Sequence, residues 1–458
     1  MKPSRCIHVW TQSYSAAPGG IQTFSRFLVE ALRANFPAAE ICVFAKRDGS
    51  GPIKVRKGGD VFASTRDECA TQKEADIRVL GFGGWPGPMR SLAFCFGALW
   101  RAALDRPDFI ISTHVNFAPV AGIVKRFVGR VPLCVIGHGI EVWEIPKAGL
   151  RQALREADQL VAVSQFTQAL MAKALEVDPS RIEVLPNTFD SERFQPGPKP
   201  PALLQRYGLR TDQPVILTVA RLEATEQYKG YDQVLRALPA VLQRFPDARY
   251  VIVGDGPDRK RVEALVRELA TASPSIGGQG VGDSVIFAGY VPNEELSAHY
   301  NLCDAFVMPS KGEGFGIVFL EALSCGKPVI AGNKDASVEA VLGGKLGTLV
   351  DPDSVEEIAE AIVRVLERTA LNGNGSKRST LNAQRSTPKS EGEAGGEGQT
   401  SATADPSAGG SEAGESKRST SNEDREPNEL RRHVIEAYGF LRFVERVGQI
   451  VGKLLERA

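Results

Sequence analysis

Two glutamates flank a glycine-rich turn within residues 311–331, which read KGEGFGIVFLEALSCGKPVIA. Glycines permit backbone conformations and a close ligand approach that larger residues resist. The next residues predict a buried helix from Ile317, and unpaired amides at the start of such a helix suit phosphate or hydroxyl oxygens. The segment therefore predicts a site that binds phosphate or hydroxyl oxygens, with Glu313 and Glu321 on either side of it. A glycine turn before a core helix, with two solvated glutamates, would explain the same residues.

Two basic residues follow an apolar run in TVARLEATEQYKG, residues 218–230. Arg221 and Lys229 could together hold an anionic group such as a phosphate without a metal ion. Two surface cations in a loop are the alternative explanation. Gly19 and Gly20 precede a predicted helix whose first amides can also approach a diphosphate. A glycine pair after a strand is often only a tight turn, and this pair lacks the full dinucleotide-binding fingerprint.

These segments form part of an ordered series of motifs. The other members are PGGIQ (18–22), His138-Gly139, VLPNTFDSERF (184–194), VIVGDGP (251–257) and FAGYVPNEEL (287–296). Together the motifs resemble glycosyltransferase family four over roughly residues 5–370. The resemblance implies an α/β fold of the GT-B type, in which two doubly wound Rossmann-like domains face a central cleft. It also implies a retaining transferase that uses a nucleotide-diphospho-sugar.

The resemblance assigns a role to each candidate residue. Glu313 would face the donor sugar, Glu321 would accept hydrogen bonds from two ribose hydroxyls as an ionised carboxylate, and His138 would lie beside the anomeric carbon. The expected catalytic residues are His138, Glu313, Arg221 and Lys229. The expected substrate-binding residues are Gly19, Gly20, Tyr290, Val291, Gly314, Phe315, Gly316, Ile317 and Glu321.

Three features leave these assignments open. A lone histidine is more often structural, and Tyr290, Val291 and Phe315 are apolar enough to belong to the core. In the basic segment, Ala220 stands where the family usually has glycine. The loop of residues 223–228 also looks longer than usual, which puts the reach of the lysine in doubt.

Short apolar runs alternate with amphipathic segments, which is typical of a parallel sheet with helices on both faces. The first series of expected strands is 6–10, 41–45, 109–112, 133–137 and 160–163. After the proline-rich stretch of residues 195–201, a second series follows at 215–220, 250–253, 285–288, 305–308, 328–331 and 348–350. The carboxyl ends of both sheets should meet at the ligand site.

The expected organisation has five parts. They are an acceptor-side domain (1–190), a linker (191–214), a nucleotide-sugar-binding domain (215–371), a disordered low-complexity insertion (372–428) and a C-terminal helix that packs back across the domains (429–458). The insertion is rich in Ser, Gly, Glu, Thr, Lys and Arg, so it has little apolar surface to bury. The final helix should bury an apolar stripe that includes Val434, Tyr438, Leu441 and Val451.

The composition limits the classes of partner and the cellular compartment that we expect for this protein. The chain has 458 residues and a formal net charge of zero, so it offers no chain-wide attraction to nucleic acid. Its seven cysteines show neither disulfide-pair nor metal spacing, which is typical of a reducing compartment. Residues 1–10 lack a signal peptide pattern, and no apolar run is long enough to span a bilayer. We therefore expect a cytoplasmic protein.

The family mechanism is a front-face displacement in which the departing phosphate helps to deprotonate the acceptor hydroxyl. It needs no protein nucleophile and, by our expectation, no cofactor or metal ion. The sequence Asp351-Pro352-Asp353 is better explained by capping of the following helix than by metal binding. Alternatives are a sugar-nucleotide epimerase or phosphorylase of the same fold, or a catalytically silent nucleotide-sugar-binding protein.

The acceptor is less constrained by the sequence, and a sugar, a glycolipid and a small molecule all fit. Residues 81–100 carry many aromatic and aliphatic side chains among arginines. They could contact the inner face of a membrane or a lipid acceptor, although a buried helix with its approach loop is the favoured explanation. We expect acceptors from polysaccharide or glycolipid biosynthesis.

Overall fold

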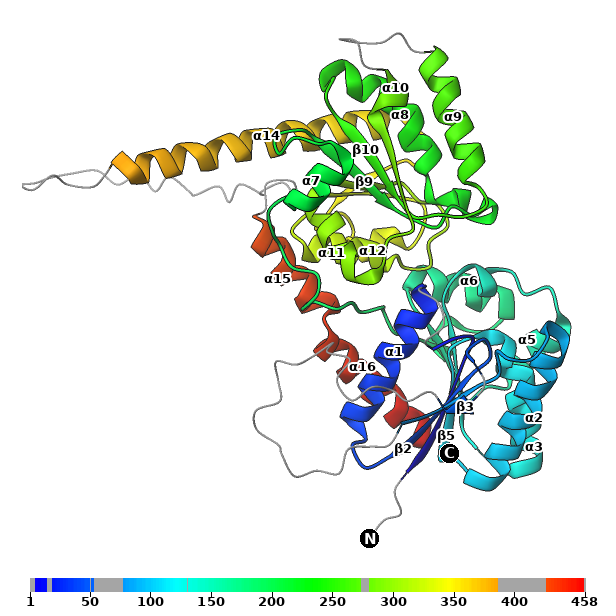
Figure 1. The fold of residues 1–458 in the computed structure, drawn as a ribbon. Coiled ribbons are helices and arrows are strands. Elements are labelled where there is room, and N and C mark those ends of the chain that lie inside the picture. Colours follow the sequence, from blue (N-terminus) through cyan, green and yellow to red (C-terminus); the bar gives the residue numbers. More distant parts are fainter. Residues whose placement is uncertain are drawn as a thin grey trace, which may run out of the picture.

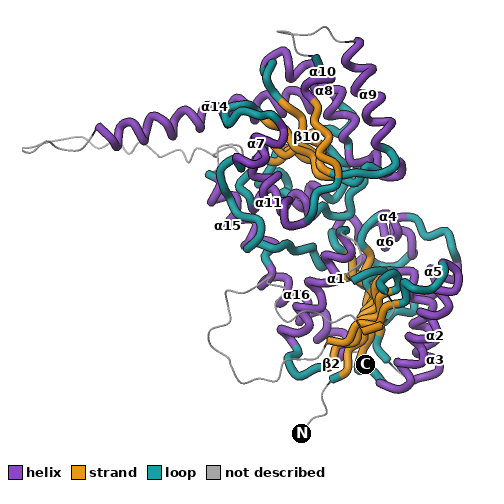
Figure 2. Tube along the Cα trace, in the orientation of Figure 1, coloured by secondary structure: helices purple, strands orange, loops and turns teal. Residues whose placement is uncertain are grey.

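A computed structural model describes residues 5–14, 19–49, 51–52, 77–129, 131–272, 280–385 and 426–456. It contains two sheets, one in each lobe of the molecule (Figures 1 and 2). This architecture, with helices on both sides of parallel sheets, confirms the expected α/β fold with two Rossmann-like domains.

The N-terminal sheet has eight strands in the order β3-β4-β2-β1-β5-β6-β7-β8. Only β3 is antiparallel to its neighbour among the strands described. The strands are β1 (Cys6–Thr11), β2 (Glu40–Ala45), β3 (Gly51–Pro52), β4 (Ile77–Gly81), β5 (Phe109–Ser112), β6 (Leu133–Gly137), β7 (Gln159–Ala162) and β8 (Ile182–Val184). Three of these, β3, β4 and β8, were not among the expected strands.

Helices cover both faces of this sheet. They are α1 (Gly20–Asn35), α2 (Gly87–Asp105), α3 (Ala118–Val128), α4 (Ile140–Trp143), α5 (Ala148–Arg155) and α6 (Gln165–Leu175), with short 3-10 turns η2 (Val115–Phe117) and η3 (Pro179–Arg181). Helix α1 packs with one apolar layer of the strands, whereas α2, α3, α5 and α6 share the other layer. Figure 1 shows α1 and α2 on opposite sides of the sheet.

The C-terminal sheet is parallel throughout, in the order β11-β10-β9-β12-β13-β14. Its strands are β9 (Val215–Val219), β10 (Arg249–Val253), β11 (Val285–Gly289), β12 (Ala305–Met308), β13 (Val329–Gly332) and β14 (Thr348–Val350). All six agree closely with the second expected series, because strands buried on both faces form continuous apolar runs.

The helices and 3-10 turn of this half are α7 (Pro201–Tyr207), η4 (Ala224–Lys229), α8 (Tyr231–Arg244), α9 (Arg259–Ala272), α10 (Val281–Ser284), α11 (Asn293–Leu302), α12 (Ile317–Ser324), α13 (Ser337–Ala340) and α14 (Val355–Arg385). Helix α7 lies inside the expected linker. Helix α14 continues past residue 372, where we expected a disordered insertion to begin, and Figure 1 shows it extending away from the domain. Most of the expected insertion, residues 386–425, lies outside the described residues.

Two helices end the chain where we expected one. Helix α15 (Pro427–Tyr438) packs on α12 of the C-terminal domain, and α16 (Phe440–Glu456) packs on α1 of the N-terminal domain. The break falls at Gly439, whose amide donates to the carbonyl of Ile435 at 2.8 Å. Leu441, which we placed in the buried stripe, is 78% exposed, because α16 buries the face that carries Phe443, Val447 and Val451 instead.

No helix among the described residues is long and apolar enough to cross a membrane. The expected helix within residues 81–100 exists as α2, but it is not fully buried. Trp85, Met89, Leu92, Phe96 and Trp100 are all exposed.

Candidate active site

The carboxyl edges of the two sheets meet at one set of loops. Thr167, at the start of α6, donates its hydroxyl to the carbonyl of Gly314 at 3.2 Å. The backbone amides of Gln165 and Phe166 both donate to the Glu339 carboxylate at 2.8 Å. A Cβ atom on Gly314 would lie 1.8 Å from the carbonyl oxygen of His138, so glycine is required for this approach. The expected donor-site segment therefore packs directly against the N-terminal domain.

Four side chains of alternating charge follow one another along this edge. Lys229 donates to Glu313 Oε1 at 2.7 Å, and its Nζ lies 3.7 Å from Glu226 Oε2. Glu226 in turn accepts a hydrogen bond from Arg221. Lys229, Glu226 and Glu313 are only 12–14% exposed, whereas Arg221 is 67% exposed. Two cations and two carboxylates thus share one site, and Arg221 is its solvent-facing member.

Local backbone structure holds the lysine and Glu313 in place. Lys229 is the last residue of η4, and Gly230 follows in a left-handed conformation against the carbonyl of Pro309, where a Cβ would lie 2.3 Å from the oxygen. The backbone amide of Glu313 donates to Asp335 at 2.7 Å, and Asp335 is buried after β13. The close packing at Gly230 therefore fixes the backbone beside Lys229, and the hydrogen bond to Asp335 fixes the backbone at Glu313.

Glu321 lies on α12 and contacts Tyr300, whose hydroxyl donates to Glu321 Oε2 at 2.7 Å. Burial raises the pKa of Glu321 to about 7, although this hydrogen bond acts in the opposite direction. We expected a fully ionised carboxylate, but the structure gives a group that is partly protonated near neutral pH in the absence of a ligand.

His138 follows β6 at the same edge. Its Nε2 lies 3.1 Å from the carbonyl oxygen of Thr113, which can only accept, so Nε2 carries the proton. Burial lowers the pKa of His138 to about 4, so the ring is neutral at physiological pH and Nδ1 is an acceptor. The ring also packs edge-on against Phe24 of α1, with 4.7 Å between centroids. A neutral, oriented imidazole can accept a hydrogen bond from a sugar hydroxyl.

The glycine pair and the expected base-contacting residues differ in accessibility. Gly20 begins α1, and a Cβ atom on it would meet no other atom within 4 Å. Tyr290 is 62% exposed, whereas Val291 is buried in the core. Phe315 is also buried, with its ring edge-on to Tyr438. Val291 and Phe315 can therefore offer only backbone groups to a ligand.

Comparison with known proteins bears on this geometry. Residues 18–193 match the model described as "Glycosyltransferase Family 4", and residues 201–381 match "Glycosyl transferases group 1". A GDP-mannose-dependent monoacylated alpha-(1-6)-phosphatidylinositol monomannoside mannosyltransferase of Corynebacterium glutamicum is 32% identical over 400 residues, which is 82% of this chain and 93% of that protein. The chain belongs to glycosyltransferase family 4.

Two further relatives of this family 4 chain are informative. A GDP-mannose-dependent alpha-(1-6)-phosphatidylinositol monomannoside mannosyltransferase of Mycolicibacterium smegmatis is 36% identical over 259 residues. The match covers 54% of this chain and only 64% of the length of that relative. The structure of sucrose-phosphate synthase from Thermosynechococcus elongatus aligns with a TM-score of 0.61 at 19% identity, covering 83% of this chain and all of that one. The last similarity shows the fold alone.

Several residues of the candidate site were not predicted from the sequence. Glu226 lies in the loop that looked longer than usual, which was the only signal of an altered site there. Tyr300 and Asp335 hold the two predicted glutamates, but they come from α11 and from the turn after β13. No spacing in the sequence connects them to their partners, because the contacts depend on how the helices pack.

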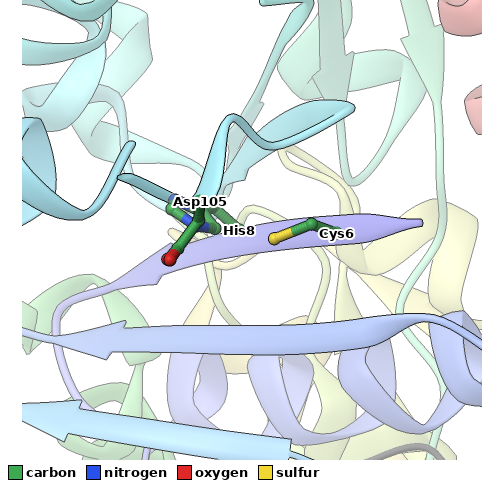
Figure 3. Close-up of side chains that lie close together, drawn as sticks. All are labelled: Cys6, His8 and Asp105. Atoms are coloured by element: carbon green, nitrogen blue, oxygen red, sulfur yellow. The ribbon is translucent and has the colours of Figure 1, made fainter. Parts of the chain in front are cut away.

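One cluster outside this site has side chains that are able to bind a metal ion. Cys6 and His8 of β1 lie close to Asp105 at the end of α2 (Figure 3). Asp105 already binds His8 Nε2 at 3.1 Å and Arg101 at 2.8 Å. The guanidinium neutralises the carboxylate and would repel a cation, so we interpret the cluster as a packed polar network at the amino end of β1.

The Asp351-Pro352-Asp353 segment is not the helix cap that we expected. The hydroxyl of Ser354 accepts from the amide of Glu357 and caps α14 instead. Asp353 pairs with Lys311 and Lys334, and these hydrogen bonds lower the pKa of Asp353 to about 2.

Proposed function

We propose that this protein is a retaining glycosyltransferase that uses a nucleotide-diphospho-sugar. The observation that carries the proposal is the pairing of Lys229 with Glu313 at the edge where the two sheets meet, with Arg221 beside them. A cation next to a carboxylate at this edge can serve both ends of a sugar diphosphate, because the cation attracts phosphate and the carboxylate accepts from sugar hydroxyls.

Each residue has a distinct task in this reaction. Lys229 and Arg221 stabilise the charge that develops on the diphosphate as the bond between the anomeric carbon and the phosphate oxygen breaks. Glu313 and His138 Nδ1 orient the sugar through its hydroxyls, and Glu321 binds the ribose. The acceptor oxygen bonds to the anomeric carbon on the side that the phosphate leaves, and the acceptor proton passes to the departing phosphate. The scheme needs no cofactor or metal ion.

One relative supports our proposal for the donor and the acceptor. The Corynebacterium protein is named as GDP-mannose-dependent and as acting on a phosphatidylinositol mannoside, so we take GDP-mannose as the donor and a membrane-held glycolipid as the acceptor. The protein would then act at the inner face of the membrane.

A donor panel tests the proposal. GDP-mannose, GDP-glucose, UDP-glucose and UDP-galactose are compared by thermal shift, because a bound donor stabilises the fold by mass action. Labelled donor is then incubated with lipid extract, and both glycolipid product and released nucleoside diphosphate are measured.

The alternatives give different products. An epimerase would return a new nucleotide-sugar without release of diphosphate, and a phosphorylase would require inorganic phosphate. Donor binding without turnover across a broad acceptor panel would identify a catalytically silent protein and refute the proposal.

A further inference from the structure

Exposed large apolar side chains are concentrated on one part of the surface. Among the described residues, eight of the twelve lie on α2, its approach loop and α3. They are Trp85, Met89, Leu92, Phe96, Trp100, Leu104, Ile123 and Phe127. Helices α2 and α3 pack against each other on the side of the N-terminal domain that faces away from α16 (Figure 1). We call these eight residues the α2–α3 face.

Helix α2 is apolar on both of its sides. Phe94, Ala98 and Ala102 point into the core, as expected for a helix that covers a sheet. The opposite side carries Leu92 at 71% exposure and Phe96 at 69%. A surface helix ordinarily presents polar residues there, and contiguous exposed apolar side chains mark an interaction site.

The charge around this face is positive although the whole chain is neutral. Residues 82–130 contain six Arg and Lys residues but only two Asp and no Glu. Both acidic groups are already engaged, Asp105 by Arg101 and His8, and Asp108 by the amide of Cys6 at 2.7 Å. Arg106 and Arg126 are exposed. Lys125 is also paired, with Asp158 at 2.7 Å. The face therefore combines aromatic and aliphatic side chains with the exposed Arg106 and Arg126.

We propose that the α2–α3 face docks on a lipid bilayer that contains anionic headgroups. Tryptophan and phenylalanine suit the boundary between headgroups and acyl chains, and each nearby cation adds attraction to an anionic surface. The proposal deepens the proposed function and rests on it for the acceptor. The loop of residues 82–86 follows the carboxyl end of β4, at the same edge of the parallel sheet as His138. Docking would therefore present a lipid-held acceptor at the sheet edge that carries the site.

Vesicle flotation tests the docking directly. Purified full-length protein is mixed with phosphatidylcholine vesicles, with or without phosphatidylglycerol. We expect binding to the anionic vesicles that weakens as salt is added, because salt screens the attraction of the arginines.

Two double variants separate the apolar and the electrostatic parts. Phe96→Ser/Trp100→Ser and Arg106→Glu/Arg126→Glu should each reduce the vesicle partition coefficient at least about tenfold. Matched controls are Leu441→Ser, which is as exposed but lies on α16, and Lys345→Glu/Arg364→Glu in the C-terminal domain. The controls should bind vesicles like the wild type, and thermal unfolding should confirm that all variants are folded.

Three results would overturn the docking proposal. The first is wild-type protein that binds neither kind of vesicle, and the second is a loss of vesicle binding in the controls equal to that in the test variants. The third is a wild-type dimer in light scattering that is absent in Phe96→Ser/Trp100→Ser. The last result would make the face an interface between two copies. GDP binding, measured without vesicles, distinguishes a failure of the docking proposal from a failure of the proposed function. Wild-type protein that binds GDP but no vesicles refutes docking alone, whereas protein that binds vesicles but no nucleotide refutes the proposed function alone.

Discussion

Replacing Glu226 by glutamine should strengthen nucleotide binding, unlike most changes in a binding site. Glu226 bridges Arg221 and Lys229, the two cations assigned to the diphosphate. Among the described residues its Oε2 has no hydrogen-bond partner, and this oxygen lies 3.7 Å from Lys229 Nζ. A diphosphate must take over one or both cations and also approach this carboxylate. Glutamine keeps the shape but removes the competing charge.

The size of the effect lies between two limits. A unit charge pair at the 3.7 Å separation of Lys229 and Glu226 is worth roughly 4–5 kcal/mol at an effective dielectric constant of 20. Measured pairs with a solvent-exposed member contribute only about 0–1 kcal/mol, and Arg221 is 67% exposed. Because Lys229 keeps its contact with Glu313, we expect a gain of about 1 kcal/mol, which is roughly a fivefold lower Kd for GDP.

Titration calorimetry with GDP measures this change, and Glu223→Gln is the matched control. It removes the same charge from the same loop without touching the bridge, so its affinity should stay near that of the wild type. Unchanged or weaker GDP binding by Glu226→Gln would show that the bridge positions the cations rather than competing for them.

Four further predictions concern the candidate site and the C-terminal segments. Arg221→Ala and Lys229→Ala should each lower kcat about 100-fold, a larger effect than their effect on thermal stability, because both residues act on developing charge. Wild-type turnover by the folded variants would show that these residues do not act in the reaction. Glu321→Ala should cost about 1.5–3 kcal/mol of nucleotide binding. Wild-type affinity for GDP should also fall, with proton release on binding, as pH drops below the Glu321 pKa of about 7, because ribose hydroxyls need the ionised form. Calorimetry in buffers of different ionisation enthalpy checks this, and a pH-independent Kd would contradict it. Deleting residues 386–425 with a short join should preserve the melting temperature and donor binding, whereas truncation before Pro427 should lower both, since α15 and α16 bury apolar side chains against α12 and α1; the reverse order would overturn this division of the chain.

The same carboxyl group also makes stability depend on pH. The folded-state pKa of Glu321 lies above its ordinary value of 4.5, so the native protein binds more protons than the unfolded chain between pH 4.5 and about 7. The contribution of Glu321 to stability therefore decreases as pH rises through that window. We expect the unfolding free energy of Glu321→Gln to lose less over this range, as measured by urea denaturation.

The strands could be predicted because most of them are buried on both faces. Each then forms a short continuous apolar run, as in VILTV of β9 or LCVIG of β6. Strand β4 was missed because IRVLG follows a long polar stretch and contains an arginine, and β8 because it has only three residues. Periodicity also could not show that α2 is covered on only one side, since an apolar helix has the same sequence pattern whether or not a second layer covers it.

The sequence indicated which residue types gather at the candidate site but not how they contact one another. Motif order brought together Arg221, Lys229 and Glu313, and the structure places them on adjacent loops. The bridging role of Glu226 depends on the path of η4, which no local propensity determines. The raised pKa of Glu321 depends on burial and on Tyr300, a residue of another helix.

The chain closes on itself through its last helix, and this has a consequence for synthesis on the ribosome. Phe443 of α16 packs on Phe24 of α1, with 5.6 Å between ring centroids, and Asn35 donates to the carbonyl of Val444 at 2.9 Å. More than four hundred residues separate these partners along the chain. The nascent N-terminal domain therefore keeps the outer side of α1 uncovered until α16 has been synthesised. Contacts this distant in sequence form late and leave apolar surface exposed to aggregation in the meantime. A ribosome stalled before α16 would hold an N-terminal domain that lacks its final layer.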